Sequence, residues 1–132
     1  MVKLAKKLAE RVIKLIDRKN FAYLATLLPD GSPHVTPMWV DHEGDMLLMN
    51  TAIGRIKQRN ITRDPRVSIT IVDSNNPYDR IVIHGRVVSQ AEQGADAHID
   101  KLAKKYTGAN KYQKASPTEK RIIIKIEPLR IL

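Results

Sequence analysis

A cluster of cations near the middle of the chain is the part of this sequence best suited to bind a ligand. The segment follows an apolar run typical of a strand. Asn50, Thr51 and Gly54 favour a turn that opens a helix, and Asp64-Pro65 predicts that this helix ends near residue 63. The cations of segment 49–66 are Arg55, Lys57, Arg59, Arg63 and Arg66.

A strand, a polar turn and a basic helix together can bind an anion. The unpaired amides of a first helical turn point outward, the helix dipole adds partial positive charge, and Arg offers a planar fork for phosphate oxygens. Lys57 is expected one turn above the entry loop, within reach of a ligand bound there. In the alternative interpretation, the segment is a solvated basic helix anchored by Ile56 and Ile61. Spacing alone leaves both interpretations open.

A proline inside an expected strand marks a second unusual stretch, 35–39. Pro37 removes a ladder hydrogen bond and predicts a local irregularity. Amides exposed by this break can address the edge of a planar heterocycle, with Thr36 adding a hydroxyl and Met38 an adaptable apolar surface. In the alternative interpretation, this is an edge strand whose Trp39 packs in the core. The residues by themselves favour this alternative.

The sequence offers little chemistry that side chains perform unaided. It has no Cys, which excludes disulfides, thiolate nucleophiles and Cys-ligated metal centres. His34 and His42 share one face of an expected strand but lie about 26 Å apart at ~3.3 Å per residue, too far to bind one metal ion. His84 and His98 have no partner nearby in the sequence, so no metal ligand is assigned. No acid, base or nucleophile stands out, so we name no catalytic residue and expect a bound cofactor to carry the reaction.

The chain is strongly basic, with a formal net charge of +9 over 132 residues. Such a field suits nucleic acid, an anionic membrane or a small molecule with phosphate or carboxylate groups. The cations are spread along the chain, and an aromatic content of 5% leaves few rings to stack on bases. A nucleic-acid-binding module is therefore the less favoured alternative. With no apolar run of membrane-spanning length and no signal peptide, we expect a cytoplasmic protein without a membrane or nucleic-acid partner.

Hydrophobic periodicity predicts one domain over 1–132 that is mainly β with α insertions. An amphipathic helix is expected at about 3–18, followed by an antiparallel barrel or sandwich at about 20–132. The first three strands should form an antiparallel meander, and Gly85 predicts a bulge or a close approach. Strand edges and a modest core favour a dimer. The expected strands are 21–28, 33–42, 46–50, 67–72, 80–89 and 121–132, with helices at 54–63 and 91–106.

Four segments, taken in order, resemble a known family. They are PDGSPHVTPMWVDHEGD (29–45), NTAIGRIKQRNITRDPRVSI (50–69), NPYDRIVIHGRVV (76–88) and GADAHIDKLAKKYTG (94–108). The family is the split β-barrel flavin and deazaflavin oxidoreductases, or pyridoxamine 5′-phosphate oxidase-like superfamily. Within it, the sequence is most similar to the small branch that uses the deazaflavin coenzyme F420. The resemblance implies a six-stranded antiparallel split β-barrel of the FMN-binding type, in a homodimer with two cofactor sites at the subunit interface.

The resemblance also implies an activity and a site. The activity is hydride transfer between F420 and an unsaturated organic substrate, with FMN as the alternative cofactor in the same fold. The surplus of cations suits the polyglutamate tail of F420, because each carboxylate needs an accessible partner. Thr36, Pro37 and Met38 would line the cofactor ring; Asn50, Thr51, Arg55 and Lys57 would bind its phosphate, supported by Arg59 and Asn60; Pro77 and Tyr78 would close the site from the partner subunit.

Overall fold

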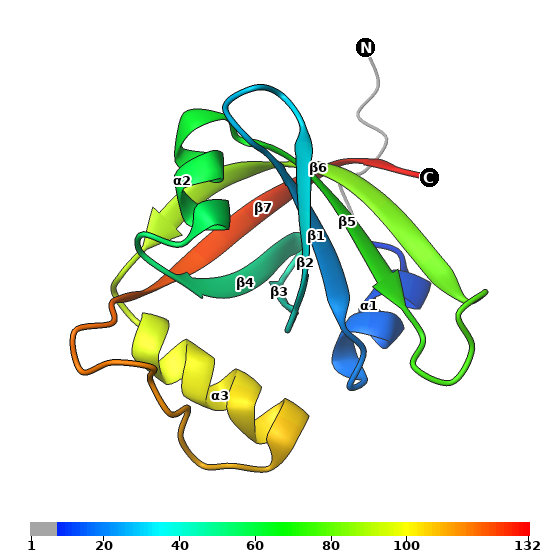
Figure 1. The fold of residues 1–132 in the computed structure, drawn as a ribbon. Coiled ribbons are helices and arrows are strands. Elements are labelled where there is room, and N and C mark those ends of the chain that lie inside the picture. The colour runs from blue at the N-terminus through cyan, green and yellow to red at the C-terminus, as the bar shows by residue number, and fades with distance from the viewer. Residues whose placement is uncertain (1–7) are drawn as a thin grey trace.

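The computed structural model describes residues 8–132, which form seven strands and three helices (Figure 1). The helices are α1 (Glu10–Asp17), α2 (Ile56–Arg63) and α3 (Ala95–Thr107). The strands are β1 (Ala22–Leu27), β2 (Pro33–Met38), β3 (Asp41–Glu43), β4 (Met46–Ala52), β5 (Arg66–Val72), β6 (Arg80–Ala91) and β7 (Arg121–Ile131). The predicted mainly β chain with helical insertions is confirmed.

All of these strands belong to one antiparallel sheet, in the order β2-β1-β5-β6-β7-β4-β3. The two outermost strands, β2 and β3, are separated in the chain only by residues 39 and 40. Since three peptide steps span at most about 11 Å, the two edges of the sheet must approach each other. The sheet therefore curls into a barrel that stays split along these edges (Figure 1), as expected.

The sequence stretch 33–42 forms two strands, where one was predicted, so the barrel has seven strands in place of six. The predicted meander is also wrong, because β2 pairs with β1 whereas β3 pairs with β4. At the break, the Val40 N–H donates to the Tyr106 hydroxyl at 3.3 Å and the Val40 carbonyl accepts from the Lys105 ammonium at 3.3 Å. Side chains of α3 thus replace the ladder partners of this residue, which lets the chain cross from one edge to the other.

The barrel interior is filled by aliphatic side chains that alternate with exposed ones along the strands. In β5, for example, Val67, Ile69 and Ile71 are buried while the residues between them are partly exposed. This period of two is the pattern expected when one face of a strand meets the core. Helix α1 closes one end of the barrel by adding Val12, Leu15 and Ile16 to the same core.

Helix α1 is shorter than the predicted helix at about 3–18. Within the described residues it begins at Glu10, after Ala9 in an extended conformation. The Leu8 N–H donates to the Asp45 carboxylate at 2.9 Å, so the chain before the helix is held by the β3–β4 turn. Residues 3–7 of the predicted helix lie outside the described residues. None of the helices described is long and apolar enough to cross a membrane.

The predicted irregularity at Gly85 is confirmed. The register between β6 and β7 shifts between His84 and Gly85. A Cβ atom at Gly85 would lie 2.7 Å from Ile126 Cγ2 and 2.9 Å from the Glu127 carbonyl oxygen. Only glycine permits this close approach of the two strands, which bends β6 and β7 together around the barrel.

Candidate functional site

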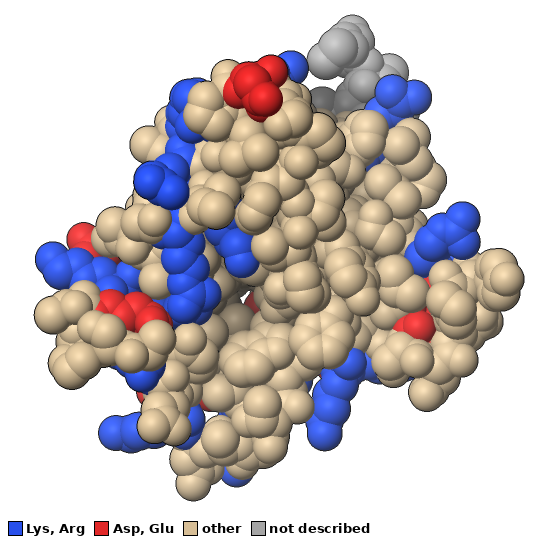
Figure 2. Space-filling model, viewed as in Figure 1, with Lys and Arg blue, Asp and Glu red and all other residues tan. Residues whose placement is uncertain are grey.

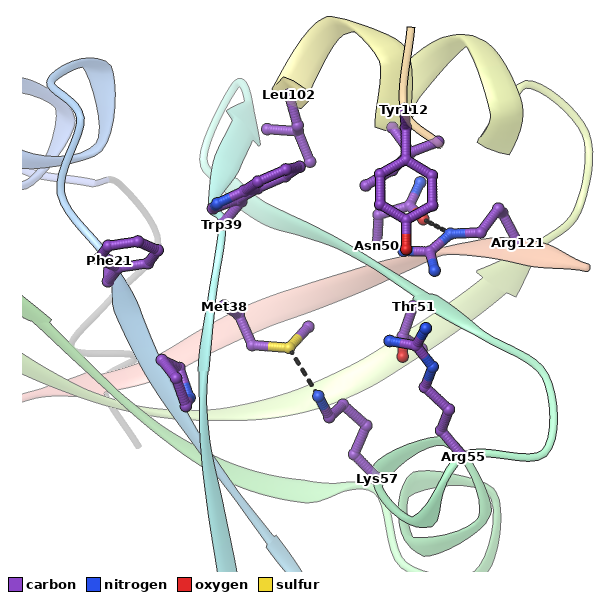
Figure 3. A pocket seen from close by; sticks show the side chains of 12 residues that line it. Phe21, Met38, Trp39, Asn50, Thr51, Arg55, Lys57, Leu102, Tyr112 and Arg121 are labelled. Atoms are coloured by element: carbon purple, nitrogen blue, oxygen red, sulfur yellow. Dashed lines mark hydrogen bonds between the residues drawn. The ribbon is translucent and has the colours of Figure 1, made fainter. Parts of the chain in front are cut away.

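A cavity of about 200 Å³ opens between β2, β4 and α2 on one side and α3 with the segment after it on the other. In Figure 3, Arg55 and Lys57 reach toward it from α2, Leu102 and Tyr112 lie across it, and Met38 stands between them. Figure 2 shows Lys and Arg side chains gathered over the α2 region, next to a hollow in the surface. The lining residues are Phe21, Pro37, Met38, Trp39, Asn50, Thr51, Arg55, Lys57, Ile99, Leu102, Tyr112 and Arg121.

The turn between β4 and α2 sets the cationic side of the cavity. Gly54 adopts a φ of 94°, a left-handed conformation that favours glycine, and its N–H donates to the Gln58 side chain at 2.9 Å. The helix then begins at Ile56, with Arg55 as its N-cap residue. The predicted strand–turn–helix unit is therefore present. It places Arg55 and Lys57 at the start of α2, where both side chains line the cavity.

Lys57 is half-buried and poorly neutralised. Among the described residues, its ammonium donates only to the Met38 thioether, at 3.2 Å, and thioether sulfur is a weak acceptor. Burial lowers the pKa of Lys57, and the positive charges of Arg55 and Arg121 lower it further. A bound anion would give this ammonium a stronger partner than the sulfur does.

Thr51 has a buried hydroxyl group that makes no hydrogen bond. The residue is 1% exposed, lines the cavity, and its Oγ1 has no partner in the described part of the chain. Leaving such a group unpaired costs about 1–3 kcal/mol, so buried polar groups are rarely left without a partner. A polar ligand atom next to Thr51 would satisfy it. We call Thr51, Arg55 and Lys57 the anion corner.

Asn50 lies in the wall of the cavity, but its side-chain amide already makes hydrogen bonds to other residues of the protein. Its Nδ2 donates to the Ala95 carbonyl at 2.9 Å and contacts His98 Nδ1 at 3.1 Å, while its Oδ1 accepts from Arg121 Nε at 2.9 Å. Since an amide nitrogen only donates, His98 Nδ1 must be the acceptor. The structure thus gives Asn50 the role of orienting Arg121, and the phosphate contact expected for it has no free donor.

His98 is held from its other side by a carboxylate. Its Nε2 lies 3.3 Å from Asp41 Oδ2, and the Lys101 ammonium lies 3.2 Å from the same oxygen. Burial would raise the pKa of Asp41, but hydrogen bonds from His98, the His42 N–H and Lys101 hold it well below its usual range. Asp41, His98 and Asn50 therefore form a hydrogen-bonded chain that ends on Arg121.

The opposite wall of the cavity is aromatic and apolar. Trp39 stacks on Tyr106 with ring centroids 5.4 Å apart and planes 6° from parallel, and it meets Tyr112 edge-on at 6.4 Å. Ile99 and Leu102 of α3 complete this wall. Trp39 therefore packs against other rings and lines the cavity, but it is only partly buried and does not belong to the hydrophobic core of the described residues. Rings on one side and cations on the other suit a flat molecule that carries an anionic group.

Residues 8–132 match the model of the pyridoxamine 5′-phosphate oxidase family. The chain belongs to this family. The match covers the whole of the described structure. It bears out the resemblance noted in the sequence and, with the antiparallel sheet, the predicted split barrel.

Solved structures similar to this pyridoxamine 5′-phosphate oxidase family member include a protein named F420 reductase. It is 29% identical with a TM-score of 0.81, and the alignment covers 95% of this chain and 98% of that one. A conserved hypothetical protein from Mycobacterium tuberculosis is 23% identical with a TM-score of 0.70, over 99% and 88% of the two chains. A Listeria innocua protein proposed to be a pyridoxamine 5′-phosphate oxidase is 22% identical with a TM-score of 0.68, over 93% and 94%.

The last two of these structures are similar in fold alone. The family match and the F420 reductase together support a function of the flavin or deazaflavin oxidoreductase type. They leave the identity of the cofactor to be argued from the site.

Five residues that sequence reasoning placed at the site do not line the cavity of this family member. Thr36 lies on β2 beside Pro37, and its buried hydroxyl has no partner in the described structure. Asn60 is buried and donates to Thr26 Oγ1 at 3.0 Å, which holds α2 against β1. Arg59 is exposed on α2. The remaining two, Pro77 and Tyr78, belong to the 73–79 loop, where Tyr78 is 85% exposed.

The sequence reasoning missed Arg121, Tyr112, Phe21, Ile99 and Leu102. Arg121 is the clearest omission, because it is a cation only 5% exposed. The available signal was its position, since Arg121 directly precedes the apolar run 122–124, where a buried charged residue needs a partner. Ile99 and Leu102 carried no signal, because apolar residues on one face of a helix are typical of a core. Phe21 and Tyr112 lie outside the helices and strands, next to β1 and after α3, and no local pattern assigns them to a site.

Proposed function

We propose that this protein is an oxidoreductase that uses F420 to transfer a hydride to an unsaturated organic substrate. The observation that carries the proposal is the anion corner beside an aromatic wall. Among residues 8–132, the buried Thr51 hydroxyl has no hydrogen-bond partner and the Lys57 ammonium donates only to a thioether. The printed name of the F420 reductase, at 29% identity, supports the same cofactor.

In this proposal the phosphate of the cofactor binds at the anion corner. Its ring lies along Thr36, Pro37 and Met38, beside Trp39. When bound, the deazaflavin supplies the hydride chemistry that no side chain of the cavity offers. The chain's own residues hold the phosphate, orient the ring and exclude water from one of its faces. Arg59, exposed on the same helix, is free to meet the carboxylates of the F420 tail.

The proposal includes a homodimer whose partner subunit completes the site. A cavity of about 200 Å³ is smaller than the roughly 300–1,000 Å³ of typical ligand pockets. One chain therefore encloses only part of a tricyclic ring with a phosphate. Pro77 and Tyr78 of the partner subunit are the residues we assign to the remaining wall.

FMN is the second candidate cofactor. It also joins a flat ring to a phosphate, so the anion corner and the aromatic wall suit it equally. The family's own description, pyridoxamine 5′-phosphate oxidase, supports this candidate. The difference lies beyond the phosphate, where only F420 continues into carboxylates.

Binding titrations with F420, FMN and a DNA duplex at about 0.15 M salt test the proposal. We expect F420 to bind most tightly, FMN more weakly and DNA only at low salt. Lys57→Ala and Arg55→Ala should each weaken cofactor binding by about tenfold to a hundredfold, the effect of losing a charge-assisted hydrogen bond.

Arg130→Ala is the matched control, because Arg130 is exposed near the end of β7 and outside the cavity. It should leave the cofactor affinity unchanged. Tight binding of FMN with none of F420 would select the second cofactor. If Lys57→Ala and Arg55→Ala bind F420 and FMN as tightly as the wild type does, the anion corner is not the phosphate-binding site.

A further inference from the structure

Arg121 is a buried cation that enters the cavity from a strand far from the anion corner in sequence. It opens β7 and pairs with Ala52, at the end of β4. Its guanidinium lies over the Tyr112 ring, 4.8 Å from the centroid, and lines the cavity (Figure 3). An arginine held this deep in a protein needs partners for its donors.

The partners of Arg121 in the described structure use only part of its hydrogen-bonding capacity. Nε donates to Asn50 Oδ1 at 2.9 Å, and one terminal nitrogen donates to Glu119 Oε2 at 3.0 Å. A guanidinium has five N–H donors in a planar fork. The remaining donors make no hydrogen bond with the residues described.

Glu119 shows where an oxyanion fits between two guanidinium groups. Its Oε2 lies 3.0 Å from Arg121 and its Oε1 lies 3.6 Å from Arg55. Glu119 thus pairs with two cations, whereas Lys57, a third cation that lines the cavity, has no carboxylate partner among the described residues. Arg121 also acts electrostatically on Lys57. After burial and the charge of Arg55, the charge of Arg121 is a further cause of the lowered pKa of that lysine. The cavity therefore has an excess of positive charge that an anionic ligand would balance.

The orientation of Arg121 is fixed before any ligand arrives. The Asn50 amide must turn its oxygen toward Arg121, because its nitrogen donates to the Ala95 carbonyl and to His98 Nδ1. His98 is in turn held by Asp41. A donor group positioned in this way loses little freedom when it binds an anion.

We propose that Arg121 is an anion-binding residue of this cavity and acts together with Arg55 on the same phosphate group. This inference deepens the proposed function and rests on it for the identity of the ligand. The Arg121 guanidinium would contact the phosphate from one side and Arg55 and Lys57 from the other, with Thr51 between them.

The test compares FMN with riboflavin, which carries the same ring without the phosphate. Both are titrated into the wild-type protein, Arg121→Gln, Arg121→Lys and the control Arg130→Gln, after circular dichroism has checked each fold. We expect Arg121→Gln to lower FMN affinity by about tenfold and leave riboflavin affinity within about twofold. Arg121→Lys keeps the charge and loses the fork, so its FMN affinity should fall in between. An unchanged ratio of FMN to riboflavin affinity in a folded Arg121→Gln protein would overturn the inference.

A second measurement separates this inference from the proposed function. Trp39 is the single tryptophan of the chain and lines the cavity, so its fluorescence reports on binding there. Inorganic phosphate is titrated into the same variants. If the wild type binds phosphate through Arg121 but binds neither F420 nor FMN, the proposed function fails and the inference stands. If wild-type protein gives no response to phosphate, or Arg121→Lys and Arg121→Gln respond like wild type, the inference fails.

Discussion

Lys57 is the residue whose surroundings a ligand anion would change most. Burial and the charges of Arg55 and Arg121 lower its pKa below the ordinary lysine value of 10.5. A phosphate beside Lys57 favours the ammonium form, so ligand binding and protonation of this lysine are coupled. Affinity for FMN should therefore be full below the pKa of Lys57 and fall as pH rises through it.

Measuring the FMN dissociation constant between about pH 7 and pH 11 checks this expectation. Riboflavin has no phosphate, and its affinity should stay level over the same range. Lys57→Arg keeps a positive charge throughout, so its FMN affinity should not show the decline. Parallel losses of FMN and riboflavin affinity in the wild type would mean that the ring or the fold titrates and that Lys57 does not.

Asp41 gives a second pH-dependent prediction, this time for stability. Its pKa is lowered in the folded protein, mainly by hydrogen bonds from His98, the His42 N–H and Lys101 that overcome the effect of burial. A lowered carboxyl pKa contributes stability above the unfolded value of about 4, and this contribution is lost as pH falls below it. Asp41→Asn should destabilise the protein at pH 7 by about 2 kcal/mol, the size of a charged hydrogen bond.

Urea unfolding at pH 7 and at about pH 3 tests this prediction. The difference in unfolding free energy between the wild type and Asp41→Asn should be smaller at the lower pH. At that pH the wild type loses part of the stabilisation that the ionised Asp41 carboxylate provides. Asp79→Asn is the control, because Asp79 forms an exposed ion pair with Arg11 at 2.8 Å. This substitution should change the unfolding free energy little at either pH. If the unfolding free energies of wild type and Asp41→Asn differ equally at both pH values, the Asp41 charge does not contribute to stability.

The strands β6 and β7 depend on one glycine for their close approach. In Gly85→Ala the new Cβ would lie 2.7 Å from Ile126 Cγ2 and 2.9 Å from the Glu127 carbonyl oxygen. Because the second contact is with backbone, the strands must move apart. We expect a loss of about 1–3 kcal/mol of unfolding free energy, as for other overpacked sites. Ser89→Ala, at an exposed position of β6, is the comparison in thermal and urea unfolding. Equal stability of the two variants would contradict the need for glycine.

Most elements were predictable from the sequence because their signals are local. The period of two in β5, the Asp64-Pro65 stop of α2 and the Gly85 bulge all depend on neighbours within a few residues. The sequence marks an irregularity at Pro37 but does not place the division of 33–42 into β2 and β3 at residues 39 and 40, because Met38, Trp39 and Val40 form an apolar run typical of a continuous strand. The division depends on Lys105 and Tyr106, which lie 65 and 66 residues away in sequence from Val40.

The site follows the same rule. Arg55, Lys57 and Thr51, which line one cavity, could be proposed from the sequence because the end of β4, one turn and the start of α2 place them together. Arg121 was missed because it reaches Asn50 across 71 residues of sequence. Asn50 was assigned to the ligand because the sequence does not reveal that Ala95, His98 and Arg121 already use its amide.

At the scale of the whole molecule, we propose that the partner subunit of a homodimer completes the cofactor site. Tyr78 lies outside the cavity of its own chain and, at 85%, is the most exposed of the large hydrophobic side chains among the described residues. In the proposed homodimer its ring covers the cavity of the partner subunit. Tyr78→Ser should therefore weaken FMN binding by about fivefold, the effect of losing roughly 1 kcal/mol of ring contact. Light scattering should give twice the 15.0 kDa chain mass for wild type and variant.

Mixing two variants distinguishes a contact across subunits from one within a chain. Lys57→Ala and Tyr78→Ser homodimers should each have two weakened sites. In the mixed dimer, the chain with Tyr78→Ser keeps its own Lys57 and receives an intact Tyr78 from the other chain, so one of the two sites is wild type. Co-expression should therefore restore tight FMN binding at about half of the sites of each mixed dimer. If Tyr78 contacted the cavity of its own chain, both sites of the mixed dimer would stay weak and no recovery would be seen.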